Sequence, residues 1–253
     1  MRENRIRKNW AADKAVICGW LAIPSAFSAE VMANEDFDAV LVDTQHGMIE
    51  VQTAISMLQA ISTKSPAPMV RVNWNDPAPI MKLLDAGAYG VICPMVNSAE
   101  ECQRFVQACR YPPDGYRSFG PARGLLYGGP DYFEHANASV VTMAMIETRD
   151  AMGRLDEIMS TRGLDGVYIG PSDLSIGLGY PPSLDPTAKE VLDAIDTILK
   201  TARKHKVVPG IHTPGGKVAK KWIDKGFRLC ALSNDSRLLA AQAKAEIVAA
   251  RGG

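Results

Sequence analysis

Residues 39–94 read AVLVDTQHGMIEVQTAISMLQAISTKSPAPMVRVNWNDPAPIMKLLDAGAYGVICP, and their pattern decides the fold. Three short apolar runs, at 39–43, 68–73 and 90–94, alternate with two longer stretches. In those stretches apolar residues recur at helical spacing: Val51, Ile55 and Leu58, then Ile80, Leu83 and Leu84. Such alternation predicts parallel strands joined by crossover helices.

The same alternation continues on both sides of this stretch. It predicts further strands at 16–23, 140–147, 166–170, 207–212 and 228–232, and a further helix through Val191, Ile195 and Leu199. Eight strand and helix units in 253 residues match the α/β class of fold called the (β/α)₈ or TIM barrel, which commonly forms one domain of that size. We therefore expect a single domain over residues 1–253.

The composition excludes several classes of protein. With 47% hydrophobic and 22% charged residues, the chain is neither disordered nor a disulfide mini-protein. Twenty-eight basic residues balance 28 acidic ones, so the chain lacks the charge expected of a nucleic-acid binder. Its apolar runs are too short to span a membrane. The five cysteines follow no metal-binding spacing, which favours reduced thiols in a cytoplasmic protein.

The first residues, MRENRIRKNW, lack the apolar core of a secretory signal. We expect a short N-terminal helix over one end of the domain, with an organellar presequence as the alternative. Two long connections, 111–139 and 174–185, are assigned to the loops after the fourth and sixth strands. Loops after strands form the catalytic face of a barrel, so both are expected at one mouth.

Polar residues end several of the apolar runs. Asp43 ends the second strand, Arg71 lies on the third, Glu147 ends the fifth and Asp173 follows the sixth. Met143, Met145 and Glu147 alternate on one side of the fifth strand, which points the carboxylate into the barrel. Two carboxylates at one mouth favour a hard divalent cation held by Glu147 and Asp173. The alternative is an ion pair between one of these acids and Arg71.

Histidine and lysine positions refine the chemistry. His46 follows Asp43 by three residues, so we expect the carboxylate to orient the imidazole as a general base, with a purely structural histidine as the alternative. His212, at the end of the seventh strand, is a candidate for substrate contact, whereas His135 and His205 are expected on the surface. The predicted strands contain no lysine for a Schiff base. The TPGGK motif at 213–217 opens a helix, with anion binding as the alternative.

These residues together resemble the HpcH/HpaI aldolases, which are metal-dependent, class II pyruvate aldolases on a (β/α)₈ barrel. The resemblance rests on GWLAIPSAFSAE, VDTQHG, VRVN, LLDAGAYGVICPMV, YPPDGYRSFGPARG, MIET and YIGPSDLSIGLG, which cover nearly the whole chain. It implies a role in the catabolism of aromatic compounds. It also implies the site residues. Asp43 and His46 would form the acid/base pair, Arg71 would bind the keto oxygen of pyruvate, and Glu147 and Asp173 would hold Mg²⁺, Mn²⁺ or Co²⁺. The amides near Ser172 and Asp173 would bind the carboxylate of pyruvate, and Asp85 would lie in a neighbouring subunit's site.

The chain departs from the family pattern at three places. Gln45 and Met145 stand where many members have Glu and Gln, so they are expected near the substrate and to affect its choice. The segment with Arg117 and Arg123 reads RSFGPARG, which differs from some relatives in the expected aldehyde pocket.

The resulting hypothesis is reversible retro-aldol cleavage of a 4-hydroxy-2-oxoacid to pyruvate and an aldehyde. The alternatives are a related carbon–carbon lyase or oxaloacetate decarboxylase on the same site, or a non-catalytic barrel that binds ketoacids. The last helix, at 236–250, is unusually apolar, and the resemblance implies its exchange between subunits of a homohexamer built from trimers or dimers. The expected partners are small molecules, with no nucleic acid and no membrane.

Overall fold

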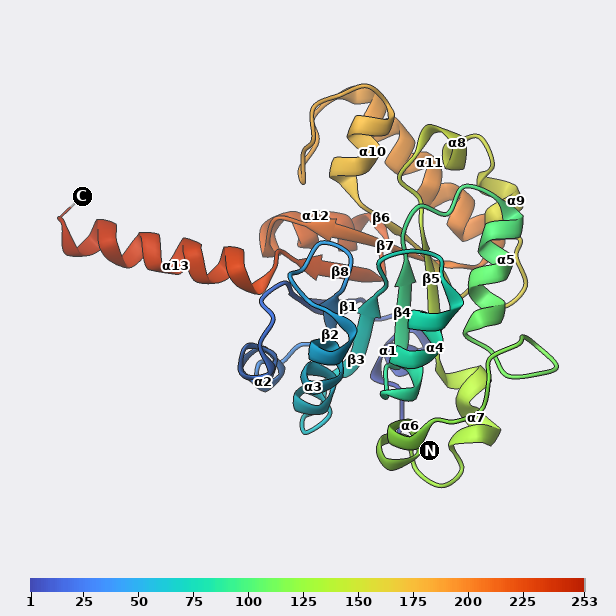
Figure 1. The fold of residues 1–253 in the computed structure, drawn as a ribbon. Coiled ribbons are helices and arrows are strands. Elements are labelled where there is room, and N and C mark those ends of the chain that lie inside the picture. The colour runs from blue at the N-terminus through green and yellow to red at the C-terminus, as the bar shows by residue number, and fades with distance from the viewer. Residues whose placement is uncertain (253) are drawn as a thin grey trace.

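The computed structural model describes residues 1–252 and contains a closed barrel of eight parallel strands that follow one another in chain order (Figure 1). The strands are β1 (Val16–Leu21), β2 (Ala39–Asp43), β3 (Ala67–Arg71), β4 (Gly90–Cys93), β5 (Val141–Met145), β6 (Gly166–Ile169), β7 (Val208–Thr213) and β8 (Leu229–Leu232). The predicted (β/α)₈ barrel is confirmed. Strand boundaries differ from the predicted ones by two residues at most.

Helices surround the barrel and join its strands. Within residues 1–252 they are α1 (Arg5–Ala11), α2 (Ala26–Asn34), α3 (Val51–Ile61), α4 (Pro77–Asp85), α5 (Ala99–Ala108), α6 (Ala122–Gly128), α7 (Tyr132–Ser139), α8 (Arg149–Met152), α9 (Leu155–Met159), α10 (Pro171–Gly177), α11 (Lys189–His205), α12 (Gly216–Lys225) and α13 (Asp235–Ala250). The helices predicted from apolar spacing correspond to α3, α4 and α11.

Strand alternation divides the apolar residues into two layers. Side chains such as Leu41, Met69 and Met143 fill the barrel interior, whereas the larger cluster lies between strands and helices. Met143 and Met145 both belong to the interior cluster, as the alternation on β5 predicts. Glu147, two residues beyond Met145, is 3% exposed at the end of this interior column. The strand order therefore delivers a buried carboxylate to the carboxyl end of the barrel.

Helix α1 covers the amino end of the barrel. Ile6 packs into the interior cluster, and the Trp10 indole N–H donates to the Arg228 carbonyl, 2.8 Å away. Arg7 donates to the carbonyls of Ser139 and Val140, just before β5. With this end covered, the carboxyl end, next to α10, is left for a site (Figure 1).

Residues 111–139 lie at the covered end, so the prediction that they follow the fourth strand at the mouth is wrong. Helix α5 intervenes between β4 and this segment, which therefore connects a helix to β5. It also contains α6 and α7 rather than a plain loop. The Arg2 N–H donates to the Gly128 carbonyl, so the segment packs against the N-terminal residues (Figure 1). The other connection, 174–185, does follow β6 directly and begins within α10.

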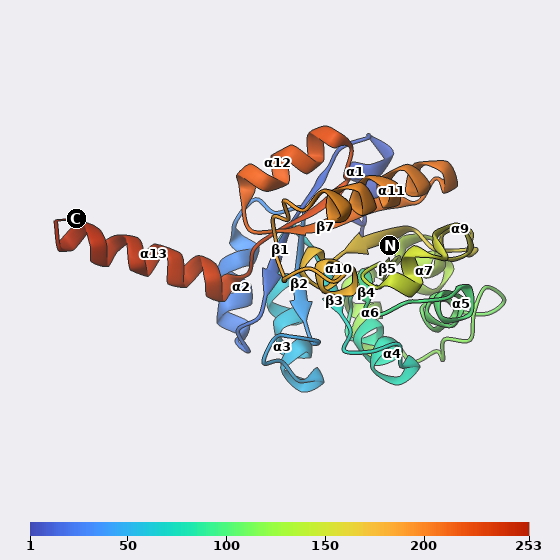
Figure 2. The same ribbon diagram turned by 90° about the horizontal axis from the view of Figure 1, so that it is seen from above.

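Helix α13 projects away from the barrel, as both views show (Figures 1 and 2). Asp235 is its one buried residue and accepts hydrogen bonds from the Ala22 N–H and the Ser28 hydroxyl. Beyond Asp235 the helix is exposed, including Leu238, Leu239, Ile247 and Val248. An isolated helix with exposed apolar residues lacks the packing that normally stabilises it.

Two further observations bear on the sequence predictions. All five cysteines are free and buried, as their irregular spacing predicts. None of the helices in the described part of the chain is long and apolar enough to cross a membrane.

Candidate active site

Asp43 and Arg71 form a buried ion pair at the carboxyl ends of β2 and β3. The two residues are opposite each other in the strand register. The Arg71 guanidinium donates from Nε and Nη2 to the two carboxylate oxygens of Asp43, at 2.9 and 2.5 Å. Burial alone would raise the pKa of Asp43, but the bonds from Arg71 hold this pKa below its ordinary value. The alternative considered from sequence, a pair between Arg71 and Glu147 or Asp173, is therefore not the pair that forms.

Trp20, on β1, contacts both members of this pair. Its indole N–H donates to Asp43 Oδ2 at 3.1 Å, and the Arg71 guanidinium carbon lies 4.9 Å from the indole ring centroid. The ring also stacks on Tyr168 of β6, with centroids 5.7 Å apart. Sequence reasoning missed both aromatic residues. The available signal was their position on strands in alternation with other inward residues, with a polar atom that requires a partner when buried.

His212, on β7, completes this layer. Its Nδ1 lies 3.1 Å from the Tyr168 hydroxyl, and its ring meets the edge of Trp20 with centroids 4.8 Å apart. Burial, with the positive charge of Arg71 adding to it, lowers the pKa of His212 to about 4. The imidazole is therefore neutral at physiological pH and contributes a hydrogen-bonding group beside the ion pair, where a substrate contact was expected.

His46 is exposed, and its imidazole is not oriented by Asp43 as expected. The contact between the two residues is the His46 backbone N–H, which donates to Asp43 Oδ1 at 3.3 Å. The Gln45 backbone N–H donates to the same oxygen at 3.1 Å. The Asp43 carboxylate therefore already accepts hydrogen bonds from Arg71, from Trp20 and from these two amides. The predicted dyad is thus replaced by a loop that wraps its backbone around Asp43 and presents His46 to solvent.

Glu147 and Asp173 converge around Gly170. A Cβ atom built on Gly170 would lie 3.2 Å from Glu147 Oε2 and 3.5 Å from Asp173 Oδ2, so both acids border one small space. Glu147 is buried, whereas Asp173, in the first turn of α10, is exposed. Burial raises the pKa of Glu147 to about 7; the hydrogen bond from the Met95 N–H lowers this pKa, and the nearby charge of Asp173 raises it by a smaller amount. The predicted convergence of these acids thus has a geometric basis in this structure.

Met95 fixes one end of Glu147. Its backbone N–H donates to Glu147 Oε1 at 2.7 Å, which leaves Oε2 to face Gly170. Met95 adopts a left-handed conformation with φ of 55°, which is uncommon for a residue with a side chain. No motif in the sequence indicates this backbone contact. Unusual backbone of this kind often occurs at functional sites.

Of the positions that depart from the family pattern, Met145 borders the same space. Met145 Sδ lies 3.9 Å from Arg71 Nη1, and its methyl carbon would lie 3.1 Å from a Cβ on Gly170. Gln45 Oε1 is buried without a hydrogen-bond partner among residues 1–252. An apolar thioether therefore lies between Arg71 and the two carboxylates. Ser172 directly precedes Asp173 in the first turn of α10, which begins at Pro171.

Asp85 is distant from this mouth in the fold. It ends α4, on the side of the barrel where the next strand begins, and accepts a hydrogen bond from Arg117 at 2.8 Å. The Arg117 side chain is fully buried and lies over the ring of Tyr111. Arg123 donates to the Ala86 carbonyl at 2.5 Å. The two arginines expected in the aldehyde pocket therefore belong to the opposite end of their own subunit.

Other candidates have structural or surface roles. His135 Nε2 lies 3.5 Å from Asp131, and His205 Nε2 lies 2.6 Å from Asp156, both at the surface of the molecule. The TPGGK motif leads into α12, which begins at Gly216. Within residues 1–252, no three His, Cys, Asp or Glu side chains are grouped to hold a metal, so Glu147 and Asp173 stand as a pair.

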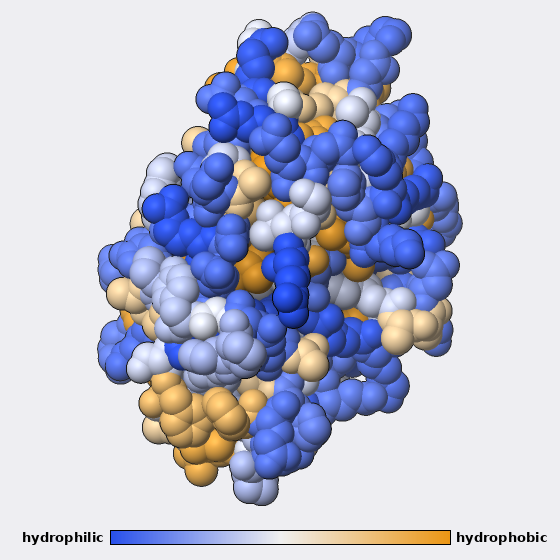
Figure 3. Space-filling model, turned by 90° about the vertical axis from the view of Figure 1, so that its right-hand side faces the viewer, coloured by the Kyte–Doolittle hydropathy of each residue, from blue (hydrophilic) through white to orange (hydrophobic). Residues whose placement is uncertain are grey.

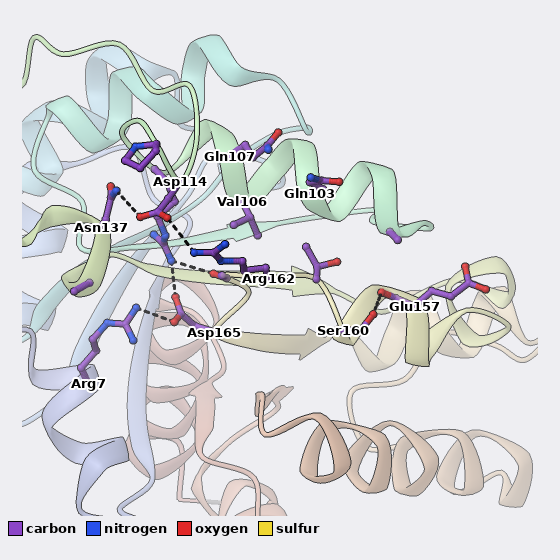
Figure 4. A pocket seen from close by; sticks show the side chains of 16 residues that line it. Arg7, Gln103, Val106, Gln107, Asp114, Asn137, Glu157, Ser160, Arg162 and Asp165 are labelled. Carbon is purple, nitrogen blue, oxygen red and sulfur yellow. Dashed lines mark hydrogen bonds and ion pairs between the residues drawn. The ribbon is translucent and has the colours of Figure 1, made fainter.

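A larger recess lies elsewhere, between α5 and α9. It measures about 650 Å³ and lies on a face that is covered mostly by hydrophilic side chains (Figures 3 and 4). Its charges are paired with each other: Asp165 lies between Arg7 and Arg110, at 2.8 and 2.9 Å (Figure 4). These pairs tie α1 to the residues before β5 and β6. The recess therefore has a structural explanation.

The chain is similar to a known family model, to named enzymes and to a solved structure. Residues 17–241 match the family model described as HpcH/HpaI aldolase/citrate lyase. A hydroxypyruvate/pyruvate aldolase from Rhizorhabdus wittichii is 42% identical over 248 residues, which cover 98% of this chain and 99% of that protein. A 4-hydroxy-2-oxo-heptane-1,7-dioate aldolase from Escherichia coli is 39% identical over 254 residues, covering 99% and 95%. The crystal structure of an HpcH/HpaI aldolase/citrate lyase family protein from Burkholderia cenocepacia J2315 has a TM-score of 0.90 at 26% identity, covering 98% and 99%.

Proposed function

This chain belongs to the HpcH/HpaI aldolase/citrate lyase family, and we propose that it is a class II pyruvate aldolase. As a carbon–carbon lyase it cleaves a 4-hydroxy-2-oxoacid reversibly to pyruvate and an aldehyde. The observation that carries the proposal is the Asp43–Arg71 pair beside the two converging carboxylates at one barrel mouth. This arrangement combines a fixed positive charge with a site for a cation, both of which a developing enolate requires.

The residues at Gly170 fit a hard divalent cation. Two carboxylate oxygens border a space that a single methyl group would fill, and both belong to hard oxygen ligands. Two protein carboxylates leave the other coordination positions to water and substrate oxygens, as is usual for Mg²⁺. Glu147 and Asp173 would hold the ion, which would supply stabilisation of negative charge on the bound ketoacid. Mg²⁺, Mn²⁺ and Co²⁺ all suit this oxygen-rich pair.

Arg71 binds the keto oxygen of the substrate. The cross-strand pair with Asp43 holds the guanidinium in place, and the guanidinium also packs on the Trp20 ring. Because Nε and Nη2 are committed to Asp43, Nη1 is the part of the guanidinium that remains for the substrate. The backbone N–H groups of Ser172 and Asp173 receive the substrate carboxylate. Met145, Gln45 and His212 line the remaining wall and influence substrate choice.

His46 acts as the general base. Its exposed position at the mouth lets it take the proton from the C4 hydroxyl, directly or through one water. The C3–C4 bond then breaks, its electron pair passes to the pyruvate enolate, and the aldehyde leaves. Arg71 meets the charge of the enolate, and a proton returned to C3 yields pyruvate. Asp43 serves in this scheme as the residue that positions Arg71 and the backbone of His46.

The assembly is proposed from α13 and Asp85. Helix α13 exposes Leu238, Leu239, Ile247 and Val248 and needs an apolar surface to cover them. We propose that subunits exchange this helix in a homo-oligomer, either a trimer or a hexamer, and that Asp85 reaches a neighbouring site. The chain is proposed to act as a single domain, and its five buried free thiols favour the cytoplasm. A role in the catabolism of aromatic compounds is likewise proposed.

One assay tests the proposal. Lactate dehydrogenase and NADH report pyruvate released from a panel of 4-hydroxy-2-oxoacids and from oxaloacetate, with and without added Mn²⁺ or Mg²⁺. A second arm runs in the synthetic direction with pyruvate or hydroxypyruvate as donor, since one relative is named for both. Metal-dependent release from hydroxy-oxoacids supports the aldolase. Release from oxaloacetate alone would identify a decarboxylase, and binding without turnover would identify a ketoacid-binding barrel.

A further inference from the structure

Gly170 occupies a position that does not require glycine for its backbone. Its φ and ψ are −91° and 97°, an extended conformation that any residue adopts. Glycine in such a place costs conformational entropy without easing backbone strain. Its presence therefore needs another reason, and the space around the missing side chain supplies one.

That space is bordered mainly by charged oxygens. A Cβ on Gly170 would meet the Met145 methyl at 3.1 Å, Glu147 Oε2 at 3.2 Å and Asp173 Oδ2 at 3.5 Å. The interior glycines of the barrel differ in this respect. At Gly166 and Gly210 a Cβ would instead meet strand backbone and the Met143 methyl, and at Gly210 also the Tyr168 ring, which is a matter of packing. Of these three positions, Gly170 is the one whose empty space faces two carboxylates.

Glu147 has little freedom to retreat from a larger residue. Its Oε1 accepts the Met95 N–H at 2.7 Å, and the side chain is 3% exposed within packed surroundings. Rotation away from Gly170 would break this hydrogen bond and leave a buried acceptor without its partner, which is costly. A methyl group at 170 would therefore stay against Oε2 and replace water or an ion there.

We propose that Gly170 determines whether a divalent cation fits between Glu147 and Asp173, because any side chain at this position occupies the space that the two carboxylates share. Gly170 is in this sense a specificity-determining residue without a functional group. The inference rests on the proposed metal-dependent function and adds to it the residue that keeps the cation site open.

The test compares Mn²⁺ binding by isothermal titration calorimetry in the wild type and Gly170→Ala, both stripped of metal. We expect Gly170→Ala to bind Mn²⁺ at least about tenfold more weakly, the range seen when residues around metal ligands change. Its far-ultraviolet circular dichroism and metal-free melting temperature should match the wild type. Mn²⁺ should raise the melting temperature of the wild type and raise that of the variant much less.

Gly153→Ala is the matched control. Gly153 follows the last residue of α8 as its C-cap, also after β5, with a helical φ of −72°, and its added Cβ would make only ordinary contacts, at 3.5 and 3.8 Å. This variant should bind Mn²⁺ like the wild type. Equal affinity in Gly170→Ala and the wild type would overturn the inference while leaving the metal role intact. Absence of Mn²⁺ binding by the wild type would reject the metal role, and the inference with it.

A second pair of variants separates loss of the cation site from simple crowding. Met145→Ala removes the nearest neighbour of the added methyl, so Gly170→Ala/Met145→Ala should fold even where the single variant does not. Its Mn²⁺ affinity is compared with that of Met145→Ala alone. Persistent weakening supports the inference, because the added methyl then acts at the carboxylates. Full recovery of affinity would overturn it, since the methyl would then have acted only by pushing Met145.

Discussion

Asp43 and Arg71 face each other across β2 and β3, and the guanidinium binds both carboxylate oxygens of its partner. Both side chains are less than 10% exposed, at 3% and 9%. Neither charge could be buried there alone without a large desolvation cost. The pair therefore explains how a positive charge is kept at the carboxyl end of an apolar barrel, where its mouth lies.

Removing either partner should affect both stability and turnover. Asp43→Ala and Arg71→Ala each leave a buried charge unpaired, which typically costs about 3–5 kcal/mol of unfolding free energy. Each should also lower kcat by about 10²-fold to 10³-fold, since a preorganised charge at the enolate is lost or misplaced. Urea unfolding and steady-state kinetics measure the two effects. In the double variant the stability losses should not add, because no unpaired charge remains; additive losses would contradict a coupled pair.

His212 should make the protein sensitive to mild acid. Its pKa of about 4 in the folded state lies below the value of 6.5 in the unfolded chain, so the unfolded state takes up the proton first. The contribution of His212 to the free energy of unfolding should therefore fall as the pH drops below 6.5 and stop falling near 4, opposite in sign to that of Glu147, whose raised pKa adds stability over part of the same range. Between pH 7 and 5 the loss should be roughly 2 kcal/mol. In His212→Asn, which keeps a polar side chain beside Tyr168, the free energy from urea unfolding at pH 7, 6 and 5 should rise relative to that of the wild type as the pH falls, because Glu147 contributes equally to both proteins. An equal pH dependence in both proteins would rule out His212 as the cause.

Metal removal should abolish catalysis without unfolding the protein. After dialysis against EDTA, release of pyruvate should fall to background and return with added Mn²⁺ or Mg²⁺, because without a cation the negative charges of Glu147 and Asp173 oppose that of an enolate. Asp173→Asn should remain folded, since Asp173 is exposed, and should need far more metal for the same rate. Circular dichroism provides the structural control. Undiminished turnover in EDTA would refute the metal role.

Met95 permits a test of its unusual backbone. A residue with a Cβ pays roughly 1–2 kcal/mol for a left-handed conformation that glycine adopts freely. Met95→Gly and Met95→Ala both lack the side chain and both retain the N–H that binds Glu147. The glycine variant should therefore be about 1 kcal/mol more stable than the alanine variant in urea unfolding. An alanine variant as stable as the glycine variant would mean that the loop relaxes and that the left-handed conformation is not imposed by Glu147.

The sequence was sufficient for the strands but not for the contacts between them. Apolar runs mark β1 to β8 because strands buried on both faces have little room for polar residues. Nearness along the chain predicted that Asp43 would orient the His46 imidazole, whereas strand register places Arg71 opposite Asp43 and the His46 contact is made by its backbone N–H. The Met95 N–H and the space at Gly170 belong to backbone geometry, which residue types do not encode directly. The predicted position of residues 111–139 missed α5, which lies between β4 and this segment. Because a helix returns the chain from the carboxyl end of the barrel to the amino end, the segment after α5 lies at the amino end.

The projecting helix α13 should hold subunits together. Leu238 and Leu239 are 41% and 65% exposed in the single chain, so Leu238→Ser/Leu239→Ser should weaken an assembly that buries them and barely affect the barrel itself. Light scattering coupled to size-exclusion chromatography should show the wild type as a trimer or hexamer and the variant as smaller species. Lys244→Ser, an exposed change on the same helix, should leave the mass unchanged. If Asp85 completes a neighbour's site, dissociation should also lower turnover, and dilution of the variant should lower it further. A wild type that is monomeric, or a variant with unaltered mass, would show that α13 has another purpose.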